Sequence, residues 1–420
     1  MERPILIYAS LERIREHVVK NRRALLLCSV MMRGYGVSIV AEELAKRMPQ
    51  FGWDLYVGTI RADGNYAATP TFLMNPDAQE ILKFCREWNI EVVLAQTTPY
   101  FEVLPHLVGH IPVMVYEHGD PTPAFFTGDS EERERIRQNK LQNVYPVVNK
   151  VLASSYFLVQ DIGWPGAEVV TLGCNHVPDL GLKPKNEFAS SEKALRVGTL
   201  IRLGAGEAQY KGNALFRELV SRLRANNREI EFYVMGRGTE ADGDEWRDIG
   251  VTPILNAPDD AKAEYLRTLD VFVSPSMWEG FNLPIVEAQA LGTVGIGFDV
   301  GAHPETALHL ASSMNDAISM IEHWNENQKH LELSCERAYK HVRSQLDWDV
   351  TAQNITRYCA ATSSITLTYW SANEETEKQG KSNSGGQEVG SGLLGKGIRV
   401  VRREGLIGSM RLIRKRIKGN

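Results

Sequence analysis

The feature that most constrains the fold of this chain is an alternation of short apolar runs with helical patterns, and it occurs twice. In the first half, apolar runs such as Ala24–Met32 and Val92–Ala95 alternate with helix-like stretches such as Ser38–Met48. A second alternation begins at Leu195 and continues to Phe298. Strands that alternate with helices predict parallel sheets covered on both faces. We therefore expect an α/β chain with two Rossmann-like domains that face each other across a cleft.

Composition excludes several classes of protein. The 420 residues carry a formal net charge of −5, so the overall charge does not favour nucleic-acid binding. The five cysteines are scattered without a CxxC or CxxH cluster, so the sequence indicates neither a zinc site nor a disulfide framework and fits a reducing cytosol. No apolar run approaches the length of a membrane span, and Ala24–Met32 is better interpreted as a buried strand.

One loop in the second half combines several features of an anion-binding site. The apolar run Val271–Ser274 is followed by WEGFNLPIVEA, residues 278–288. Pro284 suits the first position of a helix, because its missing N–H would have no helical partner there. The free N–H groups and the dipole at such a helix start can hold a diphosphate. Glu279 and Glu287 lie on either side, and each carboxylate can accept hydrogen bonds from a vicinal diol.

A diphosphate between two groups that bind diols describes a nucleotide sugar, with ribose on one side and hexose on the other. The alternative interpretation is that Glu287 only offsets the helix dipole and that Glu279 is a solvated loop residue. We favour the nucleotide sugar because the two glutamates occur together with the other features of the loop.

Two cations and a glycine turn also point to an anionic ligand. Arg202 follows a predicted strand and Lys211 precedes a predicted helix. Arg, with its planar fork, and Lys, as a point charge, suit a diphosphate, although both are also ordinary surface cations. Gly236 and Gly238 form a tight turn after another strand, where backbone can cover a base or a ribose.

A second glycine turn follows the first strand. Gly34 and Gly36 precede a predicted helix, but Ile39 takes the place of a third glycine, so the turn does not match a dinucleotide-binding fingerprint. We expect this loop to close over a phosphate or an incoming acceptor.

The stretch EGFNLPIVEA, residues 279–288, resembles the E-x7-E motif of retaining GT-B glycosyltransferases, especially the family 4 group. The resemblance extends to the two cations, to both glycine turns and to SQLDW at residues 344–348, which is similar to the tryptophan-bearing final helix of these enzymes. It covers about residues 24–358 in order.

The resemblance implies a role for each matching residue. Arg202 and Lys211 would bind the donor diphosphate, Glu279 the hydroxyls of the donor sugar, and Glu287 the ribose. His118 matches a first-domain histidine near the reacting sugar, although it is equally readable as a turn histidine. The donor-binding set is completed by Gly280, Phe281, Asn282 and Leu283.

The resemblance further implies that no cofactor and no metal take part. Cations and helix ends would stabilise the leaving diphosphate, and the anomeric configuration would be retained. The substrate is a nucleotide-diphosphate-sugar, and the acceptor is a glycan or a lipid-linked glycan.

The organisation along the chain follows from changes in composition and from the resemblance. Residues 182–193 are polar and unpatterned, and residues 371–392 have the composition of a disordered linker. The predicted parts are an N-terminal extension (1–23), an acceptor domain (24–180), a linker (181–194), a nucleotide-sugar domain (195–340), helices that return to the first domain (341–370), a flexible linker (371–397) and a basic amphipathic helix (398–418).

The basic segment contrasts with an acidic body. Residues 398–418 carry eight Lys or Arg and one Glu, a net charge of +7, which leaves −12 for the rest of the chain. Apolar residues recur between the arginines at roughly helical spacing, so we predict a helix on an anionic membrane surface. The alternative is a docking segment for a protein partner or a nucleic-acid arm.

These features predict a retaining, metal-independent hexosyltransferase in cell-surface polysaccharide or O-antigen-type biosynthesis, cytoplasmic and peripheral on the inner face of the membrane. The biological setting rests on analogy. Two alternatives belong to other classes: a non-catalytic glycan-binding or scaffold subunit, and another GT-B enzyme such as a nucleotide-sugar epimerase.

Overall fold

The computed structural model describes residues 21–364 except for a few short gaps. The gaps are residues 65, 67–68, 127, 185–186, 189–192, 204–208 and 226–228. The predicted N-terminal extension up to residue 20, the predicted flexible linker and the predicted basic helix over residues 398–418 lie outside the described residues.

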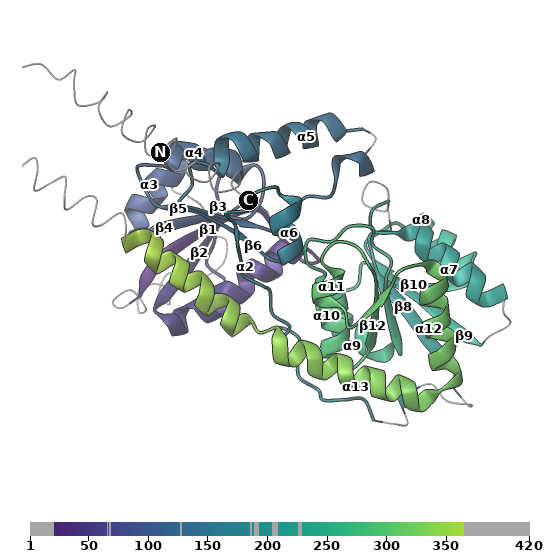
Figure 1. Cartoon of the computed structure of the whole chain (residues 1–420). Helices are drawn as coiled ribbons and strands as arrows, with labels where there is room; N and C mark the ends of the chain where they lie inside the picture. Colours follow the sequence, from purple (N-terminus) through teal and green to yellow (C-terminus); the bar gives the residue numbers. More distant parts are fainter. Residues whose placement is uncertain are drawn as a thin grey trace, which may run out of the picture. The chain divides into compact units, whose positions relative to one another are not determined.

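The first half folds into a seven-stranded sheet whose strands are all parallel (Figure 1). Its order is β3-β2-β1-β4-β5-β6-β7. The strands are β1 (Arg22–Met31), β2 (Trp53–Ala62), β3 (Thr71–Leu73), β4 (Val92–Ala95), β5 (Val113–Glu117), β6 (Lys150–Ala153) and β7 (Glu168–Val169). The connecting helices are α2 (Gly36–Arg47), α3 (Ala78–Trp88), α4 (Tyr100–Leu107), α5 (Ser130–Asn139) and α6 (Tyr156–Asp161), with short turns η1 (Met48–Phe51), η2 (Pro123–Phe125) and η3 (Lys140–Val144).

Strand β1 is apolar along its length because both of its faces are buried. Leu26 and Cys28 pack in the core that includes Leu44 of α2. Leu25 and Leu27 point to the opposite face, where α3 and α4 cover the sheet. Side chains alternate between the faces with a period of two, so a continuous apolar run is what a strand covered on both sides requires.

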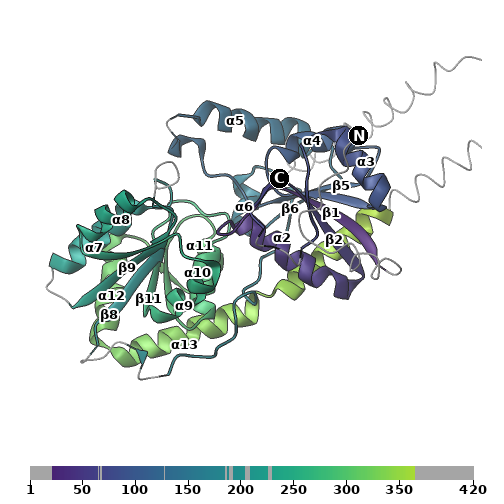
Figure 2. The ribbon, with the colours of Figure 1, turned by 180° about the vertical axis from the view of Figure 1, so that it is seen from behind.

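The second half repeats this arrangement with a six-stranded parallel sheet (Figure 2). Its order is β10-β9-β8-β11-β12-β13. The strands are β8 (Leu195–Leu200), β9 (Ile230–Gly236), β10 (Val251–Leu255), β11 (Val271–Ser274), β12 (Val294–Phe298) and β13 (His309–Ala311). The helices are α7 (Asn213–Ala225), α8 (Glu240–Arg247), α9 (Asp259–Thr268), α10 (Leu283–Ala290), α11 (His303–Thr306), α12 (Met314–Glu326) and α13 (Gln328–Gln345).

The strand order reverses at one point in each sheet. The reversal lies between β1 and β4 in the first sheet and between β8 and β11 in the second. Connections on the two sides of such a point run to opposite faces, and the loops at the carboxyl ends of the strands leave room for a ligand between them. The loop that carries Glu279 follows β11, at the reversal point of the second sheet.

The end of the described chain returns to the first sheet. Helix α13 packs against α10 in the second half. The next helix, residues 348–364, lies beside the first sheet, and Trp348, Ile355 and Cys359 belong to the same core as β1 and α2 (Figure 1). The last described helix therefore completes the core of the domain that contains the first described strand.

The segment expected to be an unpatterned linker contributes to the core of the second half. Phe188 packs in the core that contains Leu195, and Lys183 is buried and donates to the carbonyl oxygen of Leu269. Burial lowers the pKa of Lys183 to about 8. The polar composition of this stretch gave no indication that the side chains of Lys183 and Phe188 would be buried.

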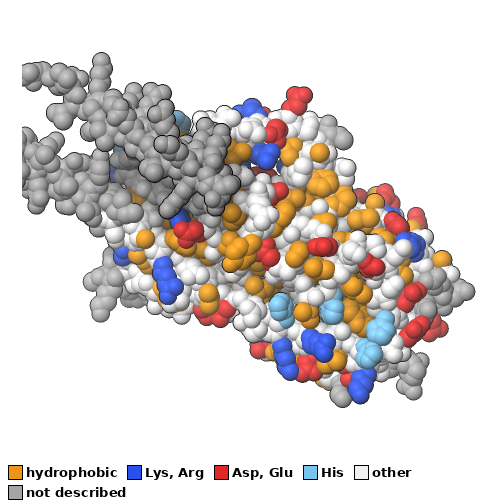
Figure 3. Space-filling view, in the orientation of Figure 1, with side chains coloured by type: hydrophobic (Ala, Val, Ile, Leu, Met, Phe, Trp, Pro, Cys, Tyr) orange, Lys and Arg blue, Asp and Glu red, His pale blue; other side chains and the backbone are white. Residues whose placement is uncertain are grey.

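The described surface carries mixed charge. On the face shown in Figure 3, Lys and Arg side chains are interspersed with Asp and Glu side chains. All five cysteines are buried thiols that form no disulfide. Within the described residues, no helix has the length and apolar character needed to cross a membrane.

Candidate active site

The loop between β11 and α10 is held by its own side chains. Asn282 caps α10, because its Oδ1 accepts a hydrogen bond from the backbone N–H of Ile285 (3.1 Å). Its Nδ2 donates to Ser274 Oγ (2.6 Å) and to Nε2 of His303 (2.9 Å). Nδ1 of His303 donates to the carbonyl oxygen of Phe298 (2.7 Å), which leaves Nε2 as the acceptor. The side chain of Asn282 therefore fixes the loop.

Glu279 lies near the start of this loop and forms an ion pair with Lys211. Their Nζ and Oε1 atoms are 2.9 Å apart. The backbone carbonyl of Glu279 accepts from Ala302 N–H (2.9 Å), and Gly301, with φ of 58°, passes so close that a Cβ would overlap the Glu279 backbone. Gly212, next to Lys211, has φ of 75° and no room for a Cβ against the carbonyl of Pro275. Two tight turns thus bring Lys211 and Glu279 together.

Glu287 lies inside α10 and is 1% exposed. Its Oε1 contacts Lys262 Nζ of α9 (2.8 Å) and His176 Nε2 (2.7 Å). Burial opposes ionisation, but the charge of Lys262 and the hydrogen bond from His176 outweigh it and lower the pKa of Glu287 to about 2. Its other oxygen, Oε2, accepts no hydrogen bond from the described part of the chain.

His118 follows β5 and is mostly enclosed. Its Nε2–H donates to Gln96 Oε1 (3.0 Å), and Gln96 Nε2 donates to the carbonyl of Val37 in the first turn of α2 (3.0 Å). Burial lowers the pKa of His118 to about 3, so the imidazole is neutral at physiological pH. The carbonyl oxygen of His118 lies so close to Gly280 that a Cβ there would overlap it. The structure therefore places His118 against the loop between β11 and α10 that carries Glu279, which we call the glutamate loop.

The glycine turn after β1 contacts the second half through Tyr35. The guanidinium carbons of Arg202 and Arg237 lie 4.7 and 5.0 Å from the centre of the Tyr35 ring, and Arg237 also donates to the carbonyl of Arg33. A Cβ on Gly36 would lie 3.6 Å from Leu283, at the start of α10. The turn and the predicted diphosphate cation Arg202 are therefore neighbours.

Gly236 and Gly238 are required for close packing of the chain, which the sequence alone does not show. A Cβ on Gly236 would overlap the carbonyl of Ile201, and one on Gly238 would lie 2.9 Å from Leu203. The backbone of Gly238 is also held by Asn256, which donates to its carbonyl (2.8 Å). A cavity of about 420 Å³ lies beside this turn and is lined by Arg33, Arg237, Asn256, Ala257 and Pro258.

A second cavity, of about 350 Å³, lies in the first half, and its lining includes Asp120, two residues after His118. Its wall includes Lys140, which is buried and forms ion pairs with Glu117 (2.9 Å) and Asp120 (2.8 Å). Tyr145 donates to the same Glu117 (2.5 Å). The other lining residues mix charge with apolar surface: Thr98, Pro121, Thr122, Pro123, Asp129, Glu132, Arg133, Ile136, Arg137, Asp161 and Ile162.

Several of these residues could not be identified from the sequence alone. Lys262 and His176 have no motif around them, and they reach Glu287 from 25 and 111 positions away. His303 and Gln96 likewise support the site through the fold. Only Arg237 carried a local signal, because it lies between the two glycines of a predicted turn.

Comparison with known families gives a match for the second half. Residues 197–348 match the family described as Glycosyl transferases group 1. The matched region contains the Lys211–Glu279 pair, Lys262 and Glu287.

Two curated relatives are similar over part of their length. The chain is 31% identical over 137 residues to MMP alpha-(1->4)-mannosyltransferase of Mycolicibacterium hassiacum, which covers 31% of this chain and 32% of that protein. It is 33% identical over 111 residues to a phosphatidyl-myo-inositol mannosyltransferase of Mycolicibacterium smegmatis, covering 25% of this chain and 28% of that protein. The chain thus spans about a third or less of the length of these relatives.

Solved structures align with most of the chain although their sequence identity to it is low. The structure of HepE from Anabaena in complex with UDP and glucose aligns with a TM-score of 0.62 at 15% identity, over 81% of this chain and 100% of that chain. The likeness concerns the fold. Two all-parallel α/β sheets with such neighbours make this a GT-B fold, as the sequence predicted.

Proposed function

We propose that this chain is a glycosyltransferase that moves a sugar from a nucleotide-diphosphate-sugar to a glycan or lipid-linked acceptor. The observation that carries the proposal is the 2.9 Å ion pair between Lys211 and Glu279 beside the start of α10. It combines a cation for a diphosphate with a carboxylate for sugar hydroxyls at the reversal point of a parallel sheet. The match of residues 197–348 to Glycosyl transferases group 1 supports the same reaction class.

In this proposal the second half binds the donor. Lys211 and Arg202 contact the diphosphate, Glu279 accepts hydrogen bonds from the donor sugar, and Glu287 accepts from the ribose. The backbone of Gly280 to Leu283 opens α10 toward the phosphates. Negative charge develops on the leaving diphosphate, and fixed cations stabilise it without a metal or a cofactor.

The acceptor binds in the first half in this proposal. The cavity of about 350 Å³ lies beside Asp120, two residues after His118, and its mixed lining suits a ligand with both hydroxyls and apolar faces. Neutral His118 acts as a hydrogen-bonding and shaping group at the reacting sugar, not as an acid. Transfer with retention, as in the family 4 group, is part of the proposal.

The setting proposed is cell-surface polysaccharide or O-antigen-type biosynthesis at the inner face of the cytoplasmic membrane. The two curated relatives are named as mannosyltransferases, and the name of one includes phosphatidyl-myo-inositol, which supports testing a nucleotide-activated mannose and lipid-linked acceptors first. The complex of HepE with UDP and glucose supports including UDP-glucose.

The test has two stages. Thermal shifts with UDP, GDP, dTDP, ADP and CMP, with and without Mg²⁺, identify the nucleotide; a ligand at about 100 times its Kd should stabilise the chain by roughly 2.7 kcal/mol. The matching nucleotide sugar is then supplied with lipid-linked and free glycan acceptors, and the anomeric configuration of the product is read by NMR.

Matched controls decide between the alternatives. Glu279→Gln should abolish transfer, whereas Glu218→Gln, which removes an exposed ion pair with Arg222, should leave it unchanged. Nucleotide binding without transfer or epimerisation would favour a scaffold subunit, and conversion of the free nucleotide sugar would favour an epimerase. If no nucleotide binds, the proposed function is wrong.

A further inference from the structure

Glu287 has an unusual set of partners for a residue on a helix that faces the second sheet. One of them, His176, comes from the segment that leaves the first sheet after β7. His176 is in turn hydrogen-bonded to Trp348, the first residue of the helix that returns to the first sheet. Glu287 is therefore tied to both chain segments that connect the two halves.

The hydrogen bonds fix the proton on His176. The indole Nε1–H of Trp348 is only a donor, and it lies 2.9 Å from His176 Nδ1, so Nδ1 must accept. The ring proton of the neutral imidazole is then on Nε2, which donates to Glu287 Oε1 at 2.7 Å. A tryptophan thus selects the tautomer that offers a hydrogen bond to the carboxylate.

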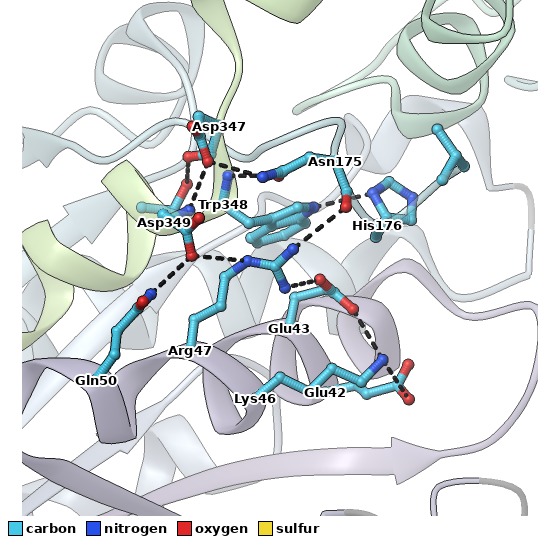
Figure 4. A network of polar contacts seen from close by, with 12 residues as sticks. Glu42, Glu43, Lys46, Arg47, Gln50, Asn175, His176, Asp347, Trp348 and Asp349 are labelled. Atoms are coloured by element: carbon cyan, nitrogen blue, oxygen red, sulfur yellow. Dashed lines mark hydrogen bonds and ion pairs between the residues drawn. The ribbon is translucent and has the colours of Figure 1, made fainter. Parts of the chain in front are cut away.

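A wider network fixes Trp348 and His176 (Figure 4). Asn175 accepts from the backbone N–H of Trp348 (2.9 Å) and donates to Asp347 (2.9 Å). Arg47, at the end of α2, donates to the carbonyl of Asn175 (3.2 Å) and forms an ion pair with Asp349 (3.1 Å). The network therefore reaches from the C-terminal end of α2 to Glu287.

The two carboxylate oxygens of Glu287 differ in their hydrogen-bond partners. Oε1 already accepts from both His176 and Lys262, while Oε2 has no hydrogen-bond donor within the described chain. A buried carboxylate oxygen without a donor is costly, so a hydroxyl from a ligand is a favourable partner for it. Hydrogen bonds that hold one oxygen of a carboxylate also fix the direction in which the other oxygen points.

We propose that His176 is a positioning residue for nucleotide recognition. In the tautomer that Trp348 selects, the Nε2–H group of His176 holds Oε1 of Glu287, so that Oε2 receives a ribose hydroxyl. This inference deepens the proposed function and rests on it. It assigns His176 and Trp348 to the binding of the ribose and leaves the diphosphate to Lys211 and Arg202. The same link makes ribose binding sensitive to the segments that join the two halves.

The test compares ribonucleotides with analogues that lack one ribose hydroxyl. The probe is whichever of UDP, GDP and ADP binds the wild type most tightly, together with its 2′-deoxy and 3′-deoxy forms, measured by calorimetry. Since a hydrogen bond to a charged group is worth about 1.5–3 kcal/mol, at least one deoxy form should bind the wild type roughly tenfold or more weakly. In His176→Ala this ratio should fall toward one, because the ribonucleotide alone loses affinity.

The variants separate positioning from simple loss of structure. His176→Gln can still donate to Glu287, so it should recover most of the ratio. Trp348→Phe, which removes the indole N–H together with part of the buried ring, should lie between His176→Ala and wild type. His309→Ala is the matched control, because His309 also packs edge-on against a tryptophan, Trp324 (5.2 Å), but lies in β13 at the edge of the second sheet. It should keep the wild-type ratio.

Two outcomes overturn the inference in different ways. If His176→Ala weakens the ribonucleotide and the deoxy forms equally, so that their ratio stays at its wild-type value, His176 has only a structural role. Where His176→Ala does not fold, Trp348→Phe takes its place, and an unchanged ratio in that variant leads to the same conclusion. If the wild type itself binds none of the three nucleotides, the proposed function fails and this inference falls with it.

Discussion

Lys211 and Glu279 neutralise each other at the point where a diphosphate sugar is proposed to bind, and their separate removal should have opposite effects. Lys211→Ala should weaken binding of inorganic diphosphate about tenfold or more, because the cation is lost and an unpaired carboxylate remains. Glu279→Gln should strengthen the same binding by about threefold to tenfold, because the ammonium is freed and a negative charge is removed. Calorimetry with diphosphate measures both changes.

The same two variants should differ in catalysis. Glu279→Gln is expected to bind diphosphate better and yet transfer sugar poorly, since the group proposed to hold the sugar is changed. The ion pair would be purely structural if both variants lost diphosphate affinity equally. Arg217→Ala, which breaks an exposed pair with Glu245, serves as the control and should change neither quantity.

The ion pair of Glu287 with Lys262 and its hydrogen bond from His176 lead to a prediction about stability in acid. Its pKa lies at about 2 in the folded chain and near 4.5 without these partners, so its contribution is present above about pH 4.5 and is lost as pH falls toward 2. Urea unfolding should show that Glu287→Gln costs up to about 3 kcal/mol at pH 7. The difference between variant and wild type should shrink at pH 3; a difference that is constant with pH contradicts this assignment.

The residues of the site differ in how far the sequence predicts them. Glu279 and Glu287 stand in one short motif, where a proline and a carboxylate spacing suffice to suggest a helix start with two acceptors. Their partners are brought to them by the sheets: Lys211 is 68 positions from Glu279, and His176 is 111 positions from Glu287. The fold brings these partners together from distant positions in the chain, so no local pattern in the sequence predicts the pairs.

At the scale of elements, substitution by alanine should distinguish glycines that are needed for close packing within the chain from glycines that are needed for the approach of a ligand. Gly280→Ala places a methyl group into the carbonyl of His118, so we expect the contact between the glutamate loop and the first half to open, with loss of both stability and transfer. Gly36→Ala meets only Leu283 at an ordinary 3.6 Å and should fold normally. Thermal unfolding and transfer rates measure both variants.

The control for this pair is Gly128→Ala, because a Cβ at Gly128 has no atom within 4 Å. It should change neither stability nor activity. Loss of nucleotide or acceptor binding in a stable Gly36→Ala protein would indicate that a ligand approaches this turn. A fully active and stable Gly280→Ala protein would show that the loop does not need its contact with His118.

The elements themselves were predictable where both faces of a strand are buried. Strands β4 and β11 have the bounds of the predicted apolar runs Val92–Ala95 and Val271–Ser274, because a strand that is covered on both faces is apolar without interruption. The short strands β3, β7 and β13 had no such run. Helix α8 has a polar composition, but Thr239 and Asp242 form a capping box at its start, and that local hydrogen bonding stabilises the helix.

At the scale of the whole molecule, the last described helix joins the two halves into one unit. Trp348 is fully buried in the core of the first sheet while its indole serves His176. Predicting two sheets requires only the alternation of patterns, but predicting that the chain returns to the first sheet required the resemblance to a family. Composition carries no information about which sheet a terminal helix covers.

The final prediction concerns the basic segment, residues 398–418, which lies outside the described residues. With a net charge of +7 on a body of −12, it should bring the chain to anionic vesicles, each cation near the surface adding about 1 kcal/mol at low salt. Co-flotation with vesicles that contain phosphatidylglycerol should fall sharply when residues 398–418 are deleted or when salt screens the charges. Transfer to a soluble acceptor should survive the deletion, because the proposed site lies within residues 21–364. If binding to neutral and anionic vesicles is equal, or if the deletion changes neither, the segment has another partner, and acceptor recognition must be sought in the first half of the chain.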